Sequence, residues 1–296
     1  MRQFLKNNHY DIIHIHSCSI RFLLQTTVTS RRENAGIIIG HAHSIGEATG
    51  SLYDRFLRLI LKAIISNNIN YGMACSKDSA IEKFSKKLIS DPNRLKIFPN
   101  AIKTDRYSYN VERRISIRGK YNIRNKFVIG IIGRLEKWKN QSFLIDAVNI
   151  ANHKQEVYLM IVGDGDIREE LKEKAATLGI SDKIIFTGAV DTAYDYYSAM
   201  DLFCLPSYAE GFPFVLVEAQ ANGLKCLISK EITEETDISQ TSEFLPITDP
   251  QIWANRIIAN IESRLPDESV ELVRREYDIK YAAKQLQAFY EKAVAI

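Results

Sequence analysis

Short apolar runs, separated by amphipathic segments, recur along the whole chain. Nine runs of four to eight residues are found at 11–16, 36–43, 71–76, 95–102, 127–133, 157–162, 183–188, 202–205 and 225–229. A run of this length that is apolar almost throughout predicts a strand buried on both faces, which is typical of parallel sheets. The sequence therefore predicts two groups of strands, an earlier group of four and a later group of five.

The segments between the runs carry apolar residues at helical spacing. Helices are predicted at 19–33, 52–66, 77–84, 142–152, 167–178, 193–200, 214–222 and 270–295. Strands alternating with helices indicate an α/β protein, in which functional groups collect at the C-terminal ends of the parallel strands. The polar, Arg-rich segment 103–124 is predicted to link two domains, which span residues 1–118 and 119–296.

The composition is that of a soluble globular protein, because 46% of its 296 residues are hydrophobic and 25% are charged. No apolar run approaches the roughly 18 residues of a membrane span, and no signal peptide opens the chain. The four cysteines form no C-x-x-C pair and lie in or beside predicted strands, which indicates buried thiols in a reducing compartment. We therefore predict a cytoplasmic protein without a disulfide, a metal site or a cofactor.

Positive charge is concentrated in the first part of the chain. Residues 1–119 have 19 Lys and Arg against 9 Asp and Glu, a net charge of +10, whereas residues 120–296 have a net charge of −7. This asymmetry indicates that the first part faces an anionic partner. Because the sequence contains no nucleic-acid motif and no basic-aromatic run, an anionic membrane or a lipid phosphate is favoured over nucleic acid.

The predicted helix 52–66 has an apolar stripe, which includes Phe56 and Leu59, and a basic stripe. Arg55, Arg58 and Lys62 form the basic stripe at positions i, i+3 and i+7. Two interpretations stay open: an ordinary surface helix, and peripheral contact with the inner face of the cell membrane.

The segment 201–229, DLFCLPSYAEGFPFVLVEAQANGLKCLIS, holds the densest candidate chemistry. A buried strand ends in a loop, and a helix then begins near Phe214 and ends at Gly223. Glu210 lies in the loop and Glu218 in the helix, eight positions apart. The helix N-terminus between them offers unpaired N–H groups and the positive end of a dipole, which suit a phosphate. A sugar joined to a diphosphate would fit between the two carboxylates.

This segment resembles the Glu-x7-Glu motif of the family 4 retaining glycosyltransferases, and its flanking residues are similar to those of the capsule, exopolysaccharide and lipopolysaccharide branch. The resemblance implies the GT-B fold, with two Rossmann-like domains and a final helix that returns to the first domain. It also implies metal-independent transfer of a hexosyl or N-acetylhexosaminyl unit from a UDP-sugar. The acceptor would be a surface polysaccharide or a lipid-linked oligosaccharide.

The same resemblance assigns roles to residues around the motif. Glu210 would contact hydroxyls of the transferred sugar and orient it for catalysis. Glu218 would accept hydrogen bonds from the ribose of the nucleotide. Gly211, Phe212 and Phe214 would present backbone N–H groups to the diphosphate.

The segment GRLEKWK after the run 127–133 resembles the family's arginine and lysine pair, here Arg134 and Lys139, which grips the donor diphosphate. Cations are needed because a nucleoside diphosphate gathers negative charge as the glycosidic bond breaks. Gly133 would leave room for a phosphate, and Val190 would contact the nucleobase. The alternative is that both cations are solvated loop residues.

His43 aligns with a histidine that many family members place near the reacting carbon. His41 is an alternative, because the sequence HAH leaves the register uncertain by two positions, and a structural role for either histidine also stays open. His14 and His16 resemble the family's H-x-H, in which at least one histidine is structural. The GDG sequence at 163–165 resembles a structural turn.

The resemblance covers only the second half of the family's N-terminal domain, because no strand precedes 11–16. That strand is expected to lie at an exposed sheet edge, which favours aggregation or a partner chain that covers it. Three explanations stay open: a shortened gene product, an engineered fragment, and a split enzyme whose other subunit supplies the missing half. In the last case this chain is a non-catalytic nucleotide-sugar-binding subunit, and a GT-B-like UDP-sugar epimerase is a further alternative.

Overall fold

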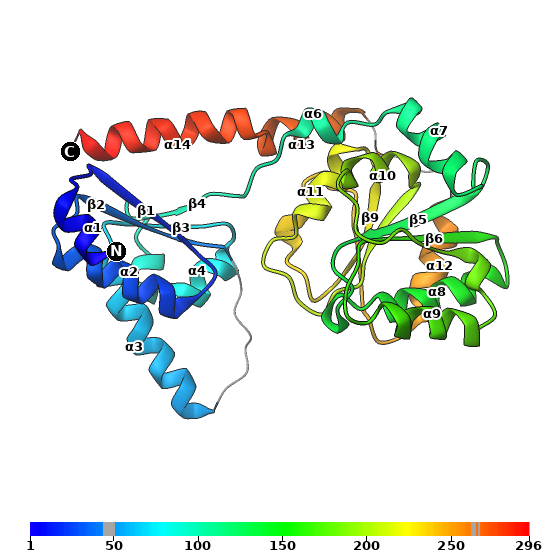
Figure 1. Ribbon diagram of the computed structural model, residues 1–296, viewed down its shortest axis with the longest axis horizontal. Helices are drawn as coiled ribbons and strands as arrows, with labels where there is room; N and C mark the ends of the chain where they lie inside the picture. Colours follow the sequence, from blue (N-terminus) through cyan, green and yellow to red (C-terminus); the bar gives the residue numbers. More distant parts are fainter. Residues whose placement is uncertain (44–50, 262–264, 266, 296) are drawn as a thin grey trace. The chain divides into compact units, whose positions relative to one another are not determined.

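The computed structural model describes residues 1–43, 51–261, 265 and 267–295, which form two compact units. The first unit comprises residues 1–100, 210–212 and the C-terminal segment from residue 282. The second comprises residues 101–209 and 213–281. A parallel sheet with helices packed on it forms the centre of each unit (Figure 1).

The described residues of the first unit form a four-stranded sheet. Its elements are α1 (Arg2–Asn7), β1 (Ile12–Ser17), α2 (Ile20–Arg32), β2 (Ile37–Ala42), α3 (Leu52–Asn68), β3 (Tyr71–Ala74), α4 (Lys77–Lys83), α5 (Lys86–Ile89), β4 (Leu95–Ile97) and most of α14 (Ile279–Val294). The strands are all parallel in the order β1-β2-β3-β4, with Ile12 opposite Ile37 and Ile39 opposite Tyr71. Their C-terminal ends therefore lie along one edge of the sheet.

One face of this first sheet is apolar and carries most of the helices. Ile15 of β1 and Ile38 of β2 lie in a core with Leu23 of α2, Ile65 of α3 and Phe84. Because side chains alternate along a strand, the remaining residues of β1 and β2 point to the opposite face. That face carries the histidines described below.

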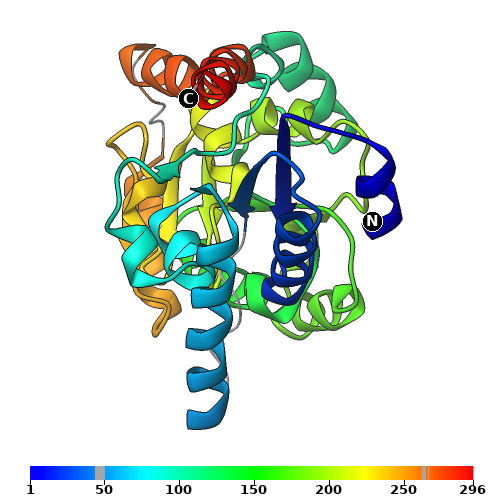
Figure 2. The ribbon, with the colours of Figure 1, turned by 90° about the vertical axis from the view of Figure 1, so that its left-hand side faces the viewer.

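Helix α3 is anchored at its C-terminal part and exposed at its N-terminal part. It begins with a capping box in which Ser51 and Asp54 exchange hydrogen bonds. Ile65 is fully buried, whereas Tyr53 and Phe56 are exposed, and Figure 2 shows the first turns of the helix extending beyond the sheet of its unit. Within the described part of the chain, no helix combines the length and the apolar character needed to cross a bilayer.

The second unit is built on a six-stranded parallel sheet in the described residues. Its elements are α6 (Thr104–Tyr107), α7 (Val111–Lys120), β5 (Phe127–Ile132), η1 (Lys137–Lys139), α8 (Gln141–Asn152), β6 (Val157–Val162), α9 (Arg168–Thr177), η2 (Ser181–Lys183), β7 (Ile184–Phe186), α10 (Ala193–Ala199), β8 (Leu202–Leu205), α11 (Phe214–Ala221), β9 (Lys225–Ser229), η3 (Glu234–Thr236), β10 (Glu243–Leu245), α12 (Pro250–Ala259) and α13 (Asp267–Tyr277). In the strand order β10-β9-β8-β5-β6-β7, strands β6 and β7 are added on one side of β5 and strands β8, β9 and β10 on the other, so the order reverses between the parallel neighbours β5 and β8. The loops on either side of such a reversal leave a crevice in which ligands bind.

Both faces of the second sheet are buried. Ile129 and Ile131 of β5 point to the core shared with α8, α9 and α12, whereas Val128 and Ile132 point to the core on the side of α10 and α11. Figure 1 shows these helices on opposite faces of the sheet. Burial on both faces explains why the central strands read as almost continuous apolar runs.

All nine predicted strands are present, but the run 95–102 gives only the short strand β4 (Leu95–Ile97). Pro99 follows and has no N–H to donate to a neighbouring strand. The elements α1, α5, α6, α7, β10 and α12 fall outside the predicted set.

The prediction that 103–124 is a linker is wrong, because the segment folds into α6 and α7 within the second unit. Arg114 and Arg118 of α7 each donate to a different carboxylate oxygen of Asp201 at 2.6 Å. Arg118 also donates to the carbonyl oxygen of Ala199 at 2.9 Å. These bonds tie the Arg-rich segment to the second sheet, so the second unit begins at residue 101 and not after residue 118.

Strand β1 lies at an edge of the first sheet, as predicted, since among the described residues it pairs with β2 alone. The final helix returns to the first unit, as the resemblance implied. Phe289 of α14 packs edge-to-face on Tyr71 of β3, with ring centroids 5.1 Å apart.

Candidate functional site

Two loops meet at the strand-order reversal of the second sheet. The loop after β5 starts at Gly133, continues through Arg134 and includes the 3₁₀ turn η1, which ends at Lys139. The loop after β8 starts at Pro206 and leads toward α11. Because β5 and β8 are hydrogen-bonded neighbours, their C-terminal ends bring both loops to one place.

Two hydrogen bonds join these loops directly. Nδ2 of Asn140 donates to the carbonyl oxygen of Pro206 at 3.2 Å, and the backbone N–H of Tyr208 donates to the carbonyl oxygen of Trp138 at 2.9 Å. Asn140 has a φ of 58°, the left-handed conformation that asparagine tolerates, and it ends the 3₁₀ turn where α8 begins. The turn that carries Lys139 is therefore fixed against the loop after β8.

Arg134 has a largely exposed side chain (63%) with two acidic neighbours. Its Nε lies 3.0 Å from Oε1 of Glu136, and its Nη2 lies 3.6 Å from Oδ2 of Asp166. Exposed ion pairs contribute about 0–1 kcal/mol to stability, so these two pairs make Arg134 only a small contributor to the stability of the fold. The pairs hold the guanidinium beside the loop while leaving it accessible to an anionic ligand.

Lys139 reaches back over Gly133. Its Nζ lies 4.4 Å from the centroid of the Trp138 ring, a cation–π contact. A Cβ added to Gly133 would lie 3.6 Å from Cε and 3.8 Å from Nζ of Lys139. The structure therefore brings together three of the predicted donor-binding residues, Gly133, Arg134 and Lys139.

The turn Gly163-Asp164-Gly165 after β6 packs against the same loop. A Cβ on Gly163 would lie 2.0 Å from the carbonyl oxygen of Gly133, and one on Gly165 would lie 2.3 Å from that of Leu135. The N–H of Leu135 donates to the carbonyl oxygen of Asp164 at 3.0 Å. Only glycines allow backbones to approach this closely, which gives the GDG turn a structural role.

Val190 lies after β7, in the next loop along the same sheet edge. It is half-buried and packs against the core on the side of α10. The carbonyl oxygen of nearby Gly188 accepts the N–H of Gly163 at 3.1 Å. The loops after β5, β6 and β7 therefore form one connected row.

The residues between β8 and α11 are divided between the two units. Glu210, Gly211 and Phe212 belong to the first unit, where Glu210 is half-buried and Phe212 is buried. Phe214 opens α11 in the second unit with an exposed side chain. The N-cap residue of α11 is Pro213, whose ring has no acceptor for the first N–H groups of the helix. This helix N-terminus therefore suits an anionic group.

Glu218 is held inside the second unit by tyrosines. Its Oε2 accepts a hydrogen bond of 2.5 Å from the hydroxyl of Tyr197. Burial raises the pKa of Glu218 above its ordinary value, and hydrogen bonds with Tyr197 and Tyr107 act in the opposite direction. The direction of this carboxylate is therefore fixed by its neighbours.

Sequence analysis does not identify Tyr107 and Tyr197 as partners of Glu218. The two rings pack edge-to-face with centroids 5.9 Å apart. Burial raises the pKa of both tyrosines, so both stay protonated and can donate. Tyr107 lies in α6, within the segment interpreted as a linker, and no local pattern connects it to a glutamate more than a hundred positions away.

His43 follows β2 in the first unit and is half-buried. Its Nε2 lies 2.8 Å from Nδ1 of His16, and its Nδ1 lies 3.1 Å from Oδ1 of Asn100. His41, two positions earlier, points to the same face of the sheet and is only 4% exposed. Both candidates thus face the same side, and His43 is the more accessible.

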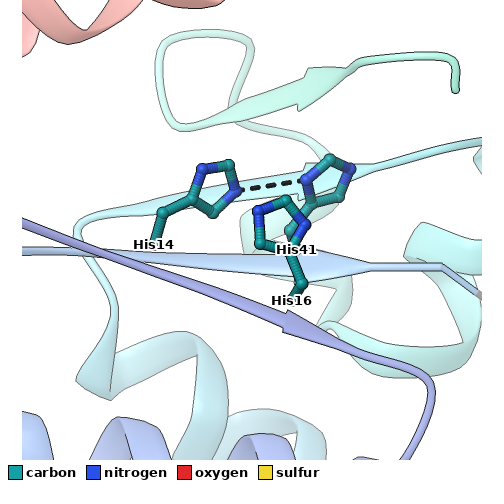
Figure 3. A group of neighbouring side chains, drawn as sticks. All are labelled: His14, His16 and His41. Carbon is teal, nitrogen blue, oxygen red and sulfur yellow. Dashed lines mark hydrogen bonds between the residues drawn. The ribbon is translucent and has the colours of Figure 1, made fainter. Parts of the chain in front are cut away.

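His14 and His16 of β1 complete a group of four histidines, of which Figure 3 shows three. The rings of His14 and His16 stack at 4.1 Å, as do those of His41 and His43. Burial lowers the pKa of all four, and repulsion between the rings helps to bring it to about 3 for His14 and about 2 for His41. These two rings are therefore neutral near pH 7. Sequence analysis predicts no metal site, yet His14, His16 and His41 form a group that could hold a metal ion.

Comparison with known proteins identifies relatives for most of the chain. Residues 113–279 match a family described as "Glycosyl transferases group 1". The chain is 26% identical over 260 residues to the putative glycosyltransferase EpsF of Bacillus subtilis, and this alignment covers 85% of this chain and 66% of EpsF. It is 27% identical over 236 residues to the Escherichia coli UDP-Gal:alpha-D-GlcNAc-diphosphoundecaprenol alpha-1,3-galactosyltransferase. That alignment covers 77% of this chain and 59% of that enzyme. The chain thus spans about two thirds or less of the length of these relatives.

A solved structure resembles the chain over nearly its whole length. HepE of Anabaena, crystallised in complex with UDP, aligns with a TM-score of 0.81 over 98% of this chain and 80% of HepE. The two sequences are 20% identical, so this likeness concerns the fold. The family match at 113–279 includes Arg134, Lys139 and both glutamates of the Glu-x7-Glu motif.

Proposed function

Because the chain belongs to the group 1 glycosyl transferases and has the GT-B fold, we propose that it is a retaining glycosyltransferase. It transfers a hexosyl or N-acetylhexosaminyl unit from a UDP-sugar to a surface polysaccharide or a lipid-linked oligosaccharide. The observation that carries the proposal is the junction, at the reversal of the second sheet, between the loop of Arg134 and Lys139 and the loop after β8.

The donor diphosphate binds at this junction. Arg134 provides a planar fork for two phosphate oxygens, Lys139 provides a point charge, and the uncapped N-terminus of α11 provides N–H groups. These groups stabilise the negative charge that develops on the leaving diphosphate, so the transfer needs no metal ion. Gly133 leaves the space through which the phosphates approach the backbone.

The nucleotide is a uridine diphosphate, with its base near Val190 and its ribose near Glu218. Two comparisons support this assignment: the E. coli relative is named for UDP-Gal, and HepE was crystallised with UDP. The tyrosine hydrogen bonds on Glu218 hold its carboxylate in a fixed direction, which suits a residue that positions a sugar hydroxyl.

The transferred sugar is oriented by Glu210, and His43 contacts the sugar or the acceptor. The acceptor hydroxyl attacks from the face that the leaving diphosphate vacates, which retains the anomeric configuration. The leaving phosphate takes the proton of that hydroxyl, so no covalent sugar–protein intermediate is required.

The acceptor is a glycan or a lipid-linked oligosaccharide, which the protein meets at the inner face of the cell membrane. The E. coli relative is named for a diphosphoundecaprenol acceptor. In this chain, support comes from the net charge of +10 over residues 1–119 and from the exposed apolar side chains of α3. An anionic membrane attracts the basic charge and accepts the apolar side chains.

A second candidate function is a nucleotide-sugar-binding subunit that needs a partner chain for transfer. Strand β1 favours it, because this strand lies at a sheet edge with partly exposed Ile12 and Ile13. An exposed apolar edge is a place where another chain can add a strand. This candidate binds UDP like the first, but it transfers sugar only after the partner is added.

Calorimetric titration of the full chain with UDP tests the donor site. Arg134→Ala and Lys139→Ala should each weaken UDP binding at least about 10-fold, since each removes a charge-assisted contact worth about 1.5–3 kcal/mol. Lys172→Ala is the matched control, because Lys172 pairs on the surface of α9 with Glu169 at 2.8 Å. Equal UDP affinity in all three variants contradicts the proposed donor site.

A transfer assay with UDP-sugars and lipid-linked acceptors tests catalysis. Glu210→Gln keeps the shape of the side chain but removes its charge, so we expect turnover to fall by about 10²–10³-fold while the affinity for UDP stays nearly unchanged. If UDP binding is lost together with turnover, the role assigned to Glu210 is wrong. Transfer that appears only after a companion chain is added identifies the second candidate.

A further inference from the structure

Two H-x-H sequences lie side by side on one face of the first sheet. His14 and His16 are in β1, His41 is in β2, and His43 follows β2 directly. In the parallel register, His16 is the direct partner of His41. Since residues two apart in a strand point to the same face, this pairing gathers four imidazoles opposite the apolar core of the unit.

Three of these rings are close enough to share one ion. One ring nitrogen from each of His14, His16 and His41 lies within 4.8 Å of the other two. Nε2 of His14 is 3.1 Å from Nδ1 of His41 (Figure 3). Nitrogens that bind a tetrahedral Zn²⁺ at about 2.0–2.1 Å lie about 3.3–3.4 Å from one another. Small side-chain rotations would therefore bring the three rings into a coordinating arrangement.

His41 provides an independent observation. It is 4% exposed, and its Nε2 has no hydrogen-bond partner among the residues that the structure describes. Buried polar atoms are hydrogen-bonded in the large majority of cases, because an unpaired one destabilises the fold. Nδ1 of His41 faces His14, and Nε2 faces no described hydrogen-bonding group, so no other protein hydrogen bond competes with a cation for this ring.

The surroundings of His14 and His16 also fit a metal site. Nδ1 of His14 lies 2.5 Å from the hydroxyl of Tyr290, which leaves Nε2 to face His41. A partner on the second ring nitrogen fixes the tautomer and the orientation of a metal-binding histidine. His16 is exposed, which gives an ion in solution access to the group.

We propose that His14, His16 and His41 bind a divalent first-row transition-metal ion such as Zn²⁺, Co²⁺ or Ni²⁺, with water as a further ligand. Imidazole nitrogens suit these ions, whereas Mg²⁺ and Ca²⁺ prefer oxygen ligands, which these three side chains do not offer. The ion connects the edge strand β1 to β2 and stabilises the native first unit by binding. Arg134 and Lys139 belong to the second unit and are no part of this group, whereas His43, which we assign to the sugar or the acceptor, contacts it through His16.

The test uses the full chain without an affinity tag, stripped of metal by a chelator and titrated with Co²⁺. We expect one Co²⁺ per chain, with the visible ligand-field absorption of a four- or five-coordinate ion. Added Zn²⁺ should raise Tm, whereas Mg²⁺ should leave both Tm and the absorption unchanged. A lack of saturable Co²⁺ binding overturns the proposal.

His16→Asn is the main variant, because His16 is exposed and its replacement leaves the core intact. Circular dichroism and melting without metal check that it folds. We expect Co²⁺ affinity to fall at least about 10-fold in His16→Asn and in His41→Asn. Replacing a residue that only hydrogen-bonds to a metal ligand already lowers metal affinity by about this factor, so removing a ligand should cost no less. His9→Asn and His153→Asn are matched controls and should keep the parent affinity. Unchanged binding in His16→Asn, or loss of binding in Cys18→Ser, contradicts the proposal.

Discussion

Glu218 shows how a single carboxylate can be kept in an apolar helix. A buried charge is costly unless donors surround it, and Glu218 has the hydroxyls of Tyr197 and Tyr107. Tyr197 is fully buried, so its hydroxyl also needs the glutamate as an acceptor. The three side chains therefore depend on one another, and they couple α6 and α10 to the helix that follows the candidate donor loop.

The raised pKa of Glu218 predicts a specific dependence of stability on pH. A carboxyl whose pKa is higher in the native state binds its proton more tightly there, so its stabilising contribution is present below the ordinary pKa of 4.5. That contribution is lost as the pH rises through the native pKa. Glu218→Gln does not titrate. We therefore expect the stability of this variant, relative to the parent chain, to increase from about pH 4 to about pH 7.

Urea denaturation at several pH values measures this difference in unfolding free energy. The expected size is about 1.4 kcal/mol for each unit by which the pKa is raised. Glu169→Gln is the control, because Glu169 is 76% exposed in α9. The difference in unfolding free energy between this variant and the parent should change little with pH. A difference for Glu218→Gln that is equally flat contradicts the assignment of the raised pKa to this residue.

The position of α7 depends on charge. Arg118 is 3% exposed and donates to the carbonyl oxygens of Ala199, Arg124 and Lys126 as well as to Asp201. The carboxylate of Asp201 also accepts the N–H of Val128 in β5 at 2.8 Å. One aspartate therefore joins α7 to the central strand of the second sheet.

Asp201→Asn should destabilise the second unit strongly. The substitution leaves Arg118 buried without its counter-charge, and breaking a buried ion pair in this way costs about 3–5 kcal/mol. Chemical denaturation measures the effect. Asp182→Asn is the control, since Asp182 pairs with Lys183 at 3.1 Å with 69% of its side chain exposed, and we expect it to cost less than about 1 kcal/mol. Equal losses in the two variants would show that Asp201 does not hold α7.

The central elements could be predicted from sequence because strands buried on both faces leave a local signal. Strand β10 (Glu243–Leu245) is too short to leave one, whereas the Asp249-Pro250 pair at the start of α12 is a recognisable helix beginning. Helix α7 was misread because its arginines look solvated in the sequence. Their partner, Asp201, is more than eighty positions away, and local patterns do not report such distances.

The candidate site also has a part that could be predicted from the sequence and a part that could not. Arg134 and Lys139 were found from a motif, and their proximity to the loop after β8 follows from the strand order that the motif's fold implies. The tyrosines around Glu218 and the pairing of His16 with His41 depend on contacts between distant segments. No periodicity in the sequence reports the register between two parallel strands, so the histidine group became visible only in three dimensions.

At the scale of the whole molecule, positive charge and exposed apolar surface occur in the same part of the chain. Tyr53, Phe56 and Leu59 of α3 are 72%, 63% and 60% exposed. Arg58 and Lys62 of the same helix bond to α4 through Glu82 and Ile81, which fixes α3 to its unit. A helix fixed in this way can present apolar side chains to a membrane whose anionic lipids attract the surrounding basic residues.

We therefore expect the full chain to bind vesicles that contain phosphatidylglycerol more tightly than vesicles of phosphatidylcholine alone. Added salt should weaken the binding, because the Debye length falls from about 10 Å at 0.1 M to about 3 Å at 1 M. Phe56→Gln combined with Leu59→Gln should reduce partitioning at least about 10-fold, since each buried apolar side chain contributes about 1.5–3 kcal/mol. Co-sedimentation with vesicles measures both effects.

Ile115→Gln provides the matched control for this membrane experiment, because Ile115 of α7 is also 60% exposed but lies in the second unit. If the control loses binding to the same extent, the vesicles are responding to apolar exposure in general and not to α3. If the double variant keeps the parent affinity, α3 is an ordinary surface helix, and the basic charge of residues 1–119 must meet its anionic partner elsewhere. Loss of binding in the double variant alone assigns the membrane contact to α3.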